Sequence, residues 1–386
     1  MYPIKKLQDC ATIIAGQSPE SKYYNSTGEG IPFFQGKADF GELYPKVRVY
    51  CSSPTKIAQY NDILLSVRAP VGPTNLSPGT VCIGRGLAAI RPDDSLDLKY
   101  LLYYFRYFET QLSAKGTGTT FKAINQKLIK NLEISIPPLN EQFRIVARIE
   151  ELFSELDKAV GTLKTIKEQL EVYRQAVLKD AFSDFEKKDS IRNLTMVVTS
   201  GSRGWAKYYS NSGALFVRIG NLTHSGIDID FRDIQHITPP DNAEGVRTRL
   251  QPNDVLVSIT ADLGSIGFVS EKVEEAYINQ HIALVRFQNP VQGRFMAWYL
   301  RSEYGQKDLL KNKRGGGKLG LGLDDIRDTP VPIVSDLVAQ KTVDEIEERL
   351  SVCDSIEKTV DATLAQANAM RQSILKQAFE GKYKGG

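Results

Sequence analysis

The chain contains one stretch twice, and this repetition constrains its fold more than any other feature. Residues 139–182 and 335–379 align without a gap at an offset of 197. Ile149-Glu150-Glu151 then falls on Ile346-Glu347-Glu348, and Arg174-Gln175 falls on Arg371-Gln372. Two unrelated amphipathic helices would not keep such a register. We therefore interpret the two stretches as copies of one element.

Apolar residues recur every seven positions in each copy, which is the spacing of a coiled-coil seam. In the first copy the a positions hold Ile149, Leu156, Leu163, Leu170 and Val177, and the d positions hold Leu152, Ala159, Ile166 and Tyr173. In the second copy the a positions hold Ile346, Cys353, Val360, Ala367 and Ile374, and the d positions hold Ile356, Thr363 and Met370, with Arg349 and Gln377 also in d-type slots. A long helix with one apolar stripe needs a partner. We expect each copy to pair with the other as an antiparallel coiled coil.

Each repeated stretch follows a segment with short β-type runs and Gly/Pro turns, such as Ile63–Val67. The two segments share a plan, because at an offset of 185 Gly16 falls on Gly201 and Lys22-Tyr23-Tyr24 falls on Lys207-Tyr208-Tyr209. The predicted fold is α+β, a tandem duplication of an α/β globule followed by a long helix. The predicted segments are 1–138, 139–185, 186–334 and 335–386.

Composition indicates an ordinary soluble protein rather than a membrane or secreted one. Of the 386 residues, 41% are hydrophobic and 25% are charged, and no apolar run approaches the length of a membrane span. The N-terminus has no signal-peptide core. The four cysteines show no CxxC spacing, and three histidines are too few to favour a structural zinc site. We therefore expect a cytoplasmic protein with reduced cysteines, no metal and no cofactor.

Net charge is +3, and most of the positive excess lies in residues 1–138. This distribution is compatible with a nucleic-acid surface on the globules but is too mild to establish one.

Two stretches superficially match catalytic motifs, but neither match is complete. Gly315-Gly316-Gly317-Lys318 superficially matches a P-loop, but that motif needs Gly at 312 and Ser or Thr at 319, where the chain has Asn312 and Leu319. Pro92-Asp93 followed by Asp97-Leu98-Lys99 matches the PD…DxK pattern of a metal-nuclease site, but the separation is too short to span the usual two strands. The sequence therefore predicts a protein that is not an enzyme. A nuclease or methyltransferase fragment with an unrecognised site, and a coiled-coil adaptor that binds only proteins, remain as alternatives.

Binding candidates lie in two matched loops, residues 16–25 and 200–209, which combine Ser, amide, basic and aromatic residues around glycines. Ser and Lys suit phosphates, and Arg or Gln can read base edges. Tyr23, Tyr24, Tyr208 and Tyr209 fit core packing equally well, whereas Arg203 and Trp205 between glycines are harder to place in a core. Two small-residue loops with basic ends, 115–122 and 313–318, precede the long helices. The candidate DNA-binding residues are Ser18, Lys22, Tyr23, Tyr24, Asn25, Gln35, Lys37, Arg68, Lys115, Thr117, Thr119, Lys122, Ser202, Arg203, Trp205, Lys207, Tyr208, Arg218, Asn221, Lys313, Arg314 and Lys318.

With these features the chain resembles the DNA-specificity subunit of a Type I restriction–modification system. The resemblance rests on Ile136-Pro-Pro-Leu-Asn-Glu-Gln142, on the Arg-Gln-x-x-Leu-Lys-x-Ala-Phe endings, and on Ser200-Gly-Ser-Arg-Gly-Trp-Ala-Lys-Tyr-Tyr209. In the second copy Ala339-Gln340 stands where the first has Glu141-Gln142.

The resemblance implies two target-recognition domains that read the halves of a split asymmetric site in double-stranded DNA, with the helices as a ruler between them. It also implies two adenine-N6 methyltransferase subunits as partners and a separate restriction/translocase subunit. S-adenosylmethionine and ATP would belong to those partners, in agreement with the motifs that this chain lacks.

Overall fold

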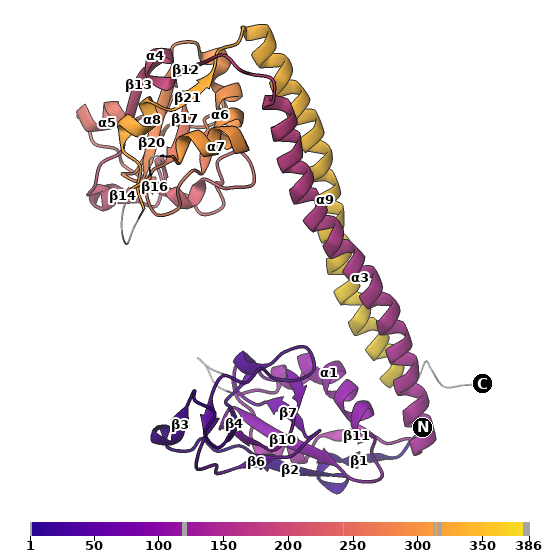
Figure 1. The fold of residues 1–386 in the computed structure, drawn as a ribbon. Coiled ribbons are helices and arrows are strands. Elements are labelled where there is room, and N and C mark those ends of the chain that lie inside the picture. Colours follow the sequence, from indigo (N-terminus) through magenta and orange to yellow (C-terminus); the bar gives the residue numbers. More distant parts are fainter. Residues whose placement is uncertain (1, 118–121, 242, 312, 315–318, 381–386) are drawn as a thin grey trace. The chain divides into compact units, whose positions relative to one another are not determined.

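The structure is a computed structural model that describes residues 2–117, 122–241, 243–311, 313–314 and 319–380. The chain divides into two compact units, residues 1–163 with 362–386 and residues 164–361. Each unit contains one globule and part of both long helices, and each is described by itself (Figure 1). No helix in the described ranges is long and apolar enough to cross a membrane.

The two copies of the repeated stretch are helices α3 (Leu139–Phe182) and α9 (Asp336–Phe379), as the sequence predicts. Helix α3 starts directly after Pro137-Pro138, since a residue that precedes proline is disfavoured in a helix.

The helices pair with each other in both units. In the second unit Lys167 and Arg174 of α3 contact Asp361 and Asp354 of α9, so the partner number falls as the α3 number rises. This order confirms the antiparallel arrangement.

The seam between the helices differs from the predicted one. The a positions are buried throughout α9, but the d-position residues Tyr173, Ile356 and Met370 are 43%, 41% and 47% exposed, so they do not form the buried centre of the seam. Positions one residue later, such as Phe153 and Leu350, are buried instead. In an α-helix of 3.6 residues per turn, residues i, i+4 and i+7 share a face as well as i, i+3 and i+7. Sequence spacing alone does not distinguish the two.

The first globule contains two sheets. Its first sheet has the order β2 (Ala11–Ala15), β10 (Leu87–Pro92), β7 (Ile63–Ser66) and β8 (Thr74–Leu76). The second has the order β3 (Tyr24–Asn25), β5 (Tyr50–Cys51), β4 (Ile31–Phe34), β9 (Val81–Ile83) and β6 (Ile57–Ala58). A separate pair joins β1 (Ile4–Lys6) to β11 (Glu133–Ser135). The helices are α1 (Leu98–Ala114), α2 (Gln126–Lys130) and the 3₁₀ turns η1 (Leu7–Asp9), η2 (Ser21–Tyr23) and η3 (Lys37–Asp39).

The second globule repeats this strand order with different residues, except that a single bridge from Arg249 to Tyr277 stands where the first globule has β6. Its first sheet has the order β13 (Thr195–Ser200), β20 (Ile282–Phe287), β17 (Val255–Ser258) and β18 (Ile266–Phe268). The second has the order β14 (Tyr209–Ser210), β16 (Gln235–Ile237), β15 (Ala214–Val217) and β19 (Ala276–Ile278), and β12 (Lys188–Ser190) pairs with β21 (Pro330–Pro332). The helices are α4 (Ile191–Leu194), α5 (Ala243–Thr248), α6 (Gly293–Arg301), α7 (Glu303–Leu309), α8 (Leu323–Arg327) and the 3₁₀ turns η4 (Trp205–Tyr208), η5 (Ile219–Asn221) and η6 (Pro290–Gln292).

A buried ion pair occurs at the same place in both globules. Asp62 is 1% exposed and accepts two hydrogen bonds from Arg91, at 2.7 and 2.8 Å. Asp254 is fully buried and accepts two from Arg286, both at 2.7 Å. A two-pronged guanidinium–carboxylate contact satisfies the buried carboxylate and fixes the strand that carries the arginine. The duplication therefore preserved a costly polar contact as well as the apolar core.

Each globule docks on its own helix through a repeated contact. In the first unit Lys99 of α1 binds Glu150 at 2.7 Å, and Tyr103 packs edge-on against Phe153. In the second unit Arg294 of α6 binds Glu347, and the indole N–H of Trp298 donates to the same carboxylate at 2.9 Å. Helices α1 and α6 thus lie between a sheet and a long helix.

Candidate nucleic-acid interface

The first globule carries an open groove of about 630 Å³ lined by exposed basic and amide side chains, here called the recognition groove. Gln35 and Lys37 come from the turn after β4, Arg68 from the segment after β7, and Arg85 from the turn between β9 and β10. Three predicted residues line this groove, and the fold brings Arg68 to Gln35 and Lys37 from about thirty residues further along the chain. Asp39 stabilises this turn, because its carboxylate accepts a hydrogen bond from the backbone N–H of Gln35 at 3.0 Å.

Sequence reasoning missed Arg85. It stands between Gly84 and Gly86, and an arginine next to a glycine in a loop, as in Arg203-Gly204, is the signal that could have found it. A Cβ on Gly86 would meet the Gln35 carbonyl oxygen at 2.1 Å, which ties the Arg85 turn closely to the Gln35 turn.

The loop 16–25 is largely structural. Gly16 is required because a Cβ there would lie 2.2 Å from the Gly84 carbonyl oxygen. Tyr24 donates to the Pro19 carbonyl at 2.7 Å and its ring lies 4.7 Å from that of Phe33, while burial raises the pKa of its hydroxyl. Asn25 caps the following turn by accepting the Glu29 amide at 3.0 Å. These contacts occupy Tyr24 and Asn25 within the loop itself.

Other members of this loop are more accessible. The hydroxyl of Ser18 accepts the Arg85 amide at 3.2 Å, which joins the loop to the recognition groove. Lys22 is exposed, lies over the Tyr23 ring and pairs with Glu20 at 2.7 Å.

In the second globule the interpretation of Trp205 as hard to place in a core is wrong. Trp205 is 3% exposed, its ring stacks on Phe216 at 5.1 Å, and its N–H donates to Glu244. Tyr277 packs in the same cluster, and burial together with its hydrogen bond to Glu275 raises the pKa of Tyr277 to about 12. Gly204 precedes the short η4 helix with a left-handed φ of 86°, and the indole of Trp205 at the start of that helix is turned inward, which the sequence did not reveal.

Arg203 and Ser202, by contrast, lie at the surface. The Arg203 side chain is exposed, and within the described ranges no ion pair or hydrogen bond engages its guanidinium. Ser202 accepts a hydrogen bond from Arg247 of α5 at 2.7 Å, and Arg247 also binds the Thr199 hydroxyl at 2.6 Å. Arg247 thus fastens the loop that carries Arg203, a role without any local sequence signal. Lys207 is exposed over the half-buried ring of Tyr208, at 4.8 Å.

Two further predicted residues have internal partners. Asn221 is 3% exposed, accepts the Arg218 amide at 2.8 Å and donates to the Asp230 carbonyl at 2.8 Å, so its prediction as a DNA contact conflicts with its burial. Arg218 is half-buried and donates to the Asp233 carbonyl at 3.2 Å.

The two basic loops are described only at their bases. Thr117 bridges to Ala123, and Arg314 bridges to Gly320, so equivalent antiparallel bridges close the bases of both loops. Arg314 pairs with Asp325 at 3.0 Å. Lys115, Lys122 and Lys313 are exposed, with Lys115 over the Phe108 ring at 5.5 Å. Thr119 and Lys318 lie outside the described residues.

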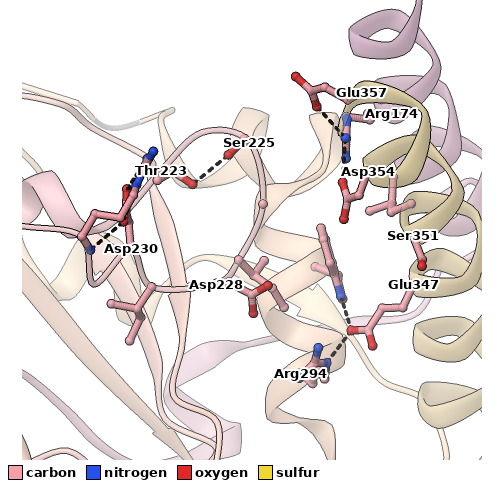
Figure 2. A pocket seen from close by; sticks show the side chains of 16 residues that line it. Arg174, Thr223, Ser225, Asp228, Asp230, Arg294, Glu347, Ser351, Asp354 and Glu357 are labelled. Atoms are coloured by element: carbon pink, nitrogen blue, oxygen red, sulfur yellow. Dashed lines mark hydrogen bonds and ion pairs between the residues drawn. The ribbon is translucent and has the colours of Figure 1, made fainter. Parts of the chain in front are cut away.

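A second kind of cavity lies where each globule meets its long helices. In the second unit it measures about 470 Å³ and is lined by Arg174, Asp354 and Glu357 on the helices and by Arg294 and Asp228 on the globule (Figure 2). Arg174 pairs with Asp354 at 2.7 Å and with Glu357 at 3.0 Å. Because these ion pairs occupy Arg174, the cavity is acidic, and we assign it a structural role.

No group of three or more His, Cys, Asp or Glu side chains suited to a metal ion occurs among the described residues. All four cysteines are free thiols in buried positions.

Two globules of one topology, each docked on a pair of long helices and each with its own exposed polar loops, define a duplicated recognition scaffold. Residues 2–172 match the type I restriction modification DNA specificity domain. Over this part the chain is similar to type I restriction enzyme specificity subunits.

Two relatives illustrate the likeness. The putative type I restriction enzyme MjaX specificity subunit of Methanocaldococcus jannaschii is 41% identical over 167 residues, which is 43% of this chain and 38% of the relative. The type I restriction enzyme EcoBI specificity subunit of Escherichia coli is 23% identical over 323 residues, 75% of this chain and 66% of the relative. The chain thus spans less than two thirds of the length of each.

A solved structure shares the fold over almost the whole chain. It comes from work on complex assembly and conformational transition of the type I R-M system, covers 98% of this chain and 97% of its own, and has a TM-score of 0.76 at 18% identity.

Proposed function

We propose that this chain is a DNA-specificity subunit that reads a bipartite asymmetric site in double-stranded DNA and directs adenine-N6 methylation and restriction by partner subunits. The observation that carries the proposal is the contrast between the two globules. They share one sheet order, yet one presents Gln35, Arg68 and Arg85 around a groove, and the other presents Arg203 on a loop fastened by Arg247. A conserved scaffold with two different exposed polar sets fits two different half-sites.

In this proposal residues 1–138 and 186–334 are the target-recognition domains. Arg and Gln side chains on rigid turns suit base edges in the major groove, and exposed lysines suit phosphates. Lys22 and Lys207 occupy equivalent places beside the two loops and would position the duplex rather than read it. The recognition groove is built on three separate turns, so its shape depends on the whole sheet.

We propose that catalysis belongs to partners. Two methyltransferase subunits and a restriction/translocase subunit would supply it, and the complex would work in the cytoplasm. Exposed apolar side chains on the long helices support docking of protein partners, since Val172, Val352 and Leu337 are 70%, 57% and 81% exposed. The same residues are the observation that favours the alternative of an adaptor that binds only proteins.

The experiment that separates these functions is a methylome comparison. Cells that contain the cognate methyltransferase are sequenced for N6-methyladenine with and without this chain. We expect a two-part asymmetric motif that is methylated only when the chain is present. Purified chain that methylates or cuts DNA without a partner, or a methylome unaffected by the chain, would contradict the proposal.

A further inference from the structure

Three cavities in the first unit share walls. The recognition groove shares Lys37 and Pro70 with a second cavity of about 400 Å³, which also contains Arg106. The second cavity shares Arg106 and Phe153 with a third of about 750 Å³ at the long helices. The three cavities therefore adjoin one another from the recognition groove to the helix pair, and the row that they form is here called the track.

Arg106 lies where the second and third cavities meet, and the carboxylates of Glu42 and Glu109 act on it only from beyond ion-pair distance. Its guanidinium donates to the Glu42 carbonyl oxygen at 3.2 Å and lies 5.8 Å from the centre of the Tyr103 ring. Within the described part of the chain no carboxylate comes within ion-pair distance of it. Burial lowers the pKa of Arg106 and Arg371 lowers it further, while Tyr103, Glu109 and Glu42 raise it without reversing the direction. A half-buried guanidinium without a counter-ion is unfavourable, so the site favours an incoming anion.

The other charges along the track strengthen this preference. Glu150 and Asp157 are occupied by Lys99 and Arg371. Glu42 and Glu109 remain as carboxylates without an ion pair, against the five cations Lys37, Arg68, Arg85, Arg106 and Lys158, which form none among the described residues. Cations therefore exceed the available carboxylates, and they are distributed over all three cavities rather than clustered in one.

The corresponding cavity of the second unit has the opposite balance. Its cations Arg174, Arg232 and Arg294 are each paired with a carboxylate, while Asp228 forms no ion pair within the described ranges (Figure 2). Arg301, the counterpart of Arg106 on α6, does not line it. Arg301 is likewise half-buried and forms no ion pair among the described residues, so the two units differ in that Arg106 lines the cavity of its unit and Arg301 does not.

We propose that the track holds the sugar–phosphate backbone of duplex DNA beyond the bases read in the recognition groove, and that Arg106 binds a phosphate there. This inference rests on the proposed function. Duplex DNA fits better than an acidic peptide because the cations follow one another from the recognition groove outward, and DNA presents phosphates at regular spacing along its length. Arg106 would then add affinity without reading sequence.

The test measures binding of the full chain to two duplexes across a range of salt concentrations. One duplex contains the methylated site found in the methylome experiment, and the other has the same composition in scrambled order. Each phosphate contact contributes about 0.9 to the slope of log affinity against log salt. We expect Arg106→Gln to reduce the slope by about that amount on the duplex with the site, and to leave the order of preference between base sequences unchanged. Arg106→Lys should retain most of the slope, because it keeps the charge.

Lys5→Gln is the matched control, since it removes one exposed positive charge on β1, outside the three cavities. It should leave the slope unchanged. Thermal unfolding confirms that the variants are folded, and Lys37→Gln provides a second test of the track if Arg106→Gln does not fold.

An unchanged slope in folded Arg106→Gln overturns the inference. So does an unchanged slope with weakened assembly of the methyltransferase complex, which would assign the track to an acidic protein surface. Wild-type chain that binds both duplexes equally would contradict the proposed function instead, while the slope would still decide whether Arg106 contacts phosphate.

Discussion

Arg174 of α3 donates a hydrogen bond to Asp354 of α9 at 2.7 Å, and the contact is made a second time by their repeat counterparts. Residues 174 and 157 of the first copy correspond to 371 and 354 of the second, and Arg371 binds Asp157. Each copy therefore supplies the arginine of one pair and the aspartate of the other. A duplicated helix that pairs antiparallel with its own copy produces this reciprocity.

Reversing the charges of one such pair tests its contribution. Arg174→Asp places a carboxylate beside Asp354 and Glu357, and we expect a loss of about 1 kcal/mol in the free energy of unfolding, since the pair is partly exposed. Adding Asp354→Arg should restore most of this loss. Urea unfolding measures all three chains. Lys164→Asp, at an exposed position without an ion pair among the described residues, should change stability by less than about 0.5 kcal/mol. A double variant no more stable than the single one would show that the Arg174–Asp354 pair does not contribute to stability.

Breaking a buried ion pair should have a larger effect. Asp254→Asn leaves Arg286 without its counter-ion in a mostly buried site, and we expect a loss of about 3 kcal/mol. Asp336→Asn, on the first turn of α9, is an exposed control with a small expected effect. Calorimetry or urea unfolding compares the two, and near-equal stability of Asp254→Asn and wild type would contradict the expectation.

The pH dependence of the same group has a defined sign. Burial raises the pKa of Asp254, and this outweighs the lowering by Arg286. The folded state therefore binds the Asp254 proton more tightly than the unfolded state does. The stability contributed by this proton is fully present below the unfolded pKa and is lost as the pH rises through the folded pKa. In Asp254→Asn this decline should vanish from the curve of unfolding free energy against pH. A steeper decline in the variant would show that the sign is wrong.

Substitutions of Arg203 and Trp205 should have different effects, although the two residues are only two positions apart. Arg203→Ala should weaken binding to the cognate site by roughly 1–3 kcal/mol if the guanidinium reads a base, with unfolding unchanged. Trp205→Ala should cost about 3–5 kcal/mol of stability, because it removes a buried ring from the cluster with Phe216. Fluorescence-anisotropy titration and thermal unfolding separate the two effects. Unaltered affinity in folded Arg203→Ala would exclude the base contact.

Helix length is expected to set the distance between the half-sites. Inserting seven residues within Leu156–Leu170 returns the apolar stripe to the same face and adds about 10 Å of helix. We expect the half-site sequences to persist and the spacer to lengthen by at most about three base pairs. A four-residue insertion shifts the stripe partly out of register and should reduce stability or partner binding. Methylome sequencing of both variants measures the spacer. An active seven-residue variant with the original spacer would show that helix length does not set the distance between the half-sites.

The sequence by itself determined the duplication, the two long helices and their pairing, because a gapless repeat with one apolar stripe has few other solutions. Composition and missing motifs also pointed away from catalysis. The sequence did not determine which residues form the helix seam, because Ile356 and Phe153 fit the same apolar spacing equally well. Only packing against the partner helix distinguishes them. Local sequence likewise placed Trp205 and Asn221 on the surface, where burial beneath distant strands puts them inside. Only the tertiary structure brought Gln35, Arg68 and Arg85 to one groove and left Arg106 without a counter-ion. Those relationships depend on contacts between residues far apart in the chain, which no local pattern records.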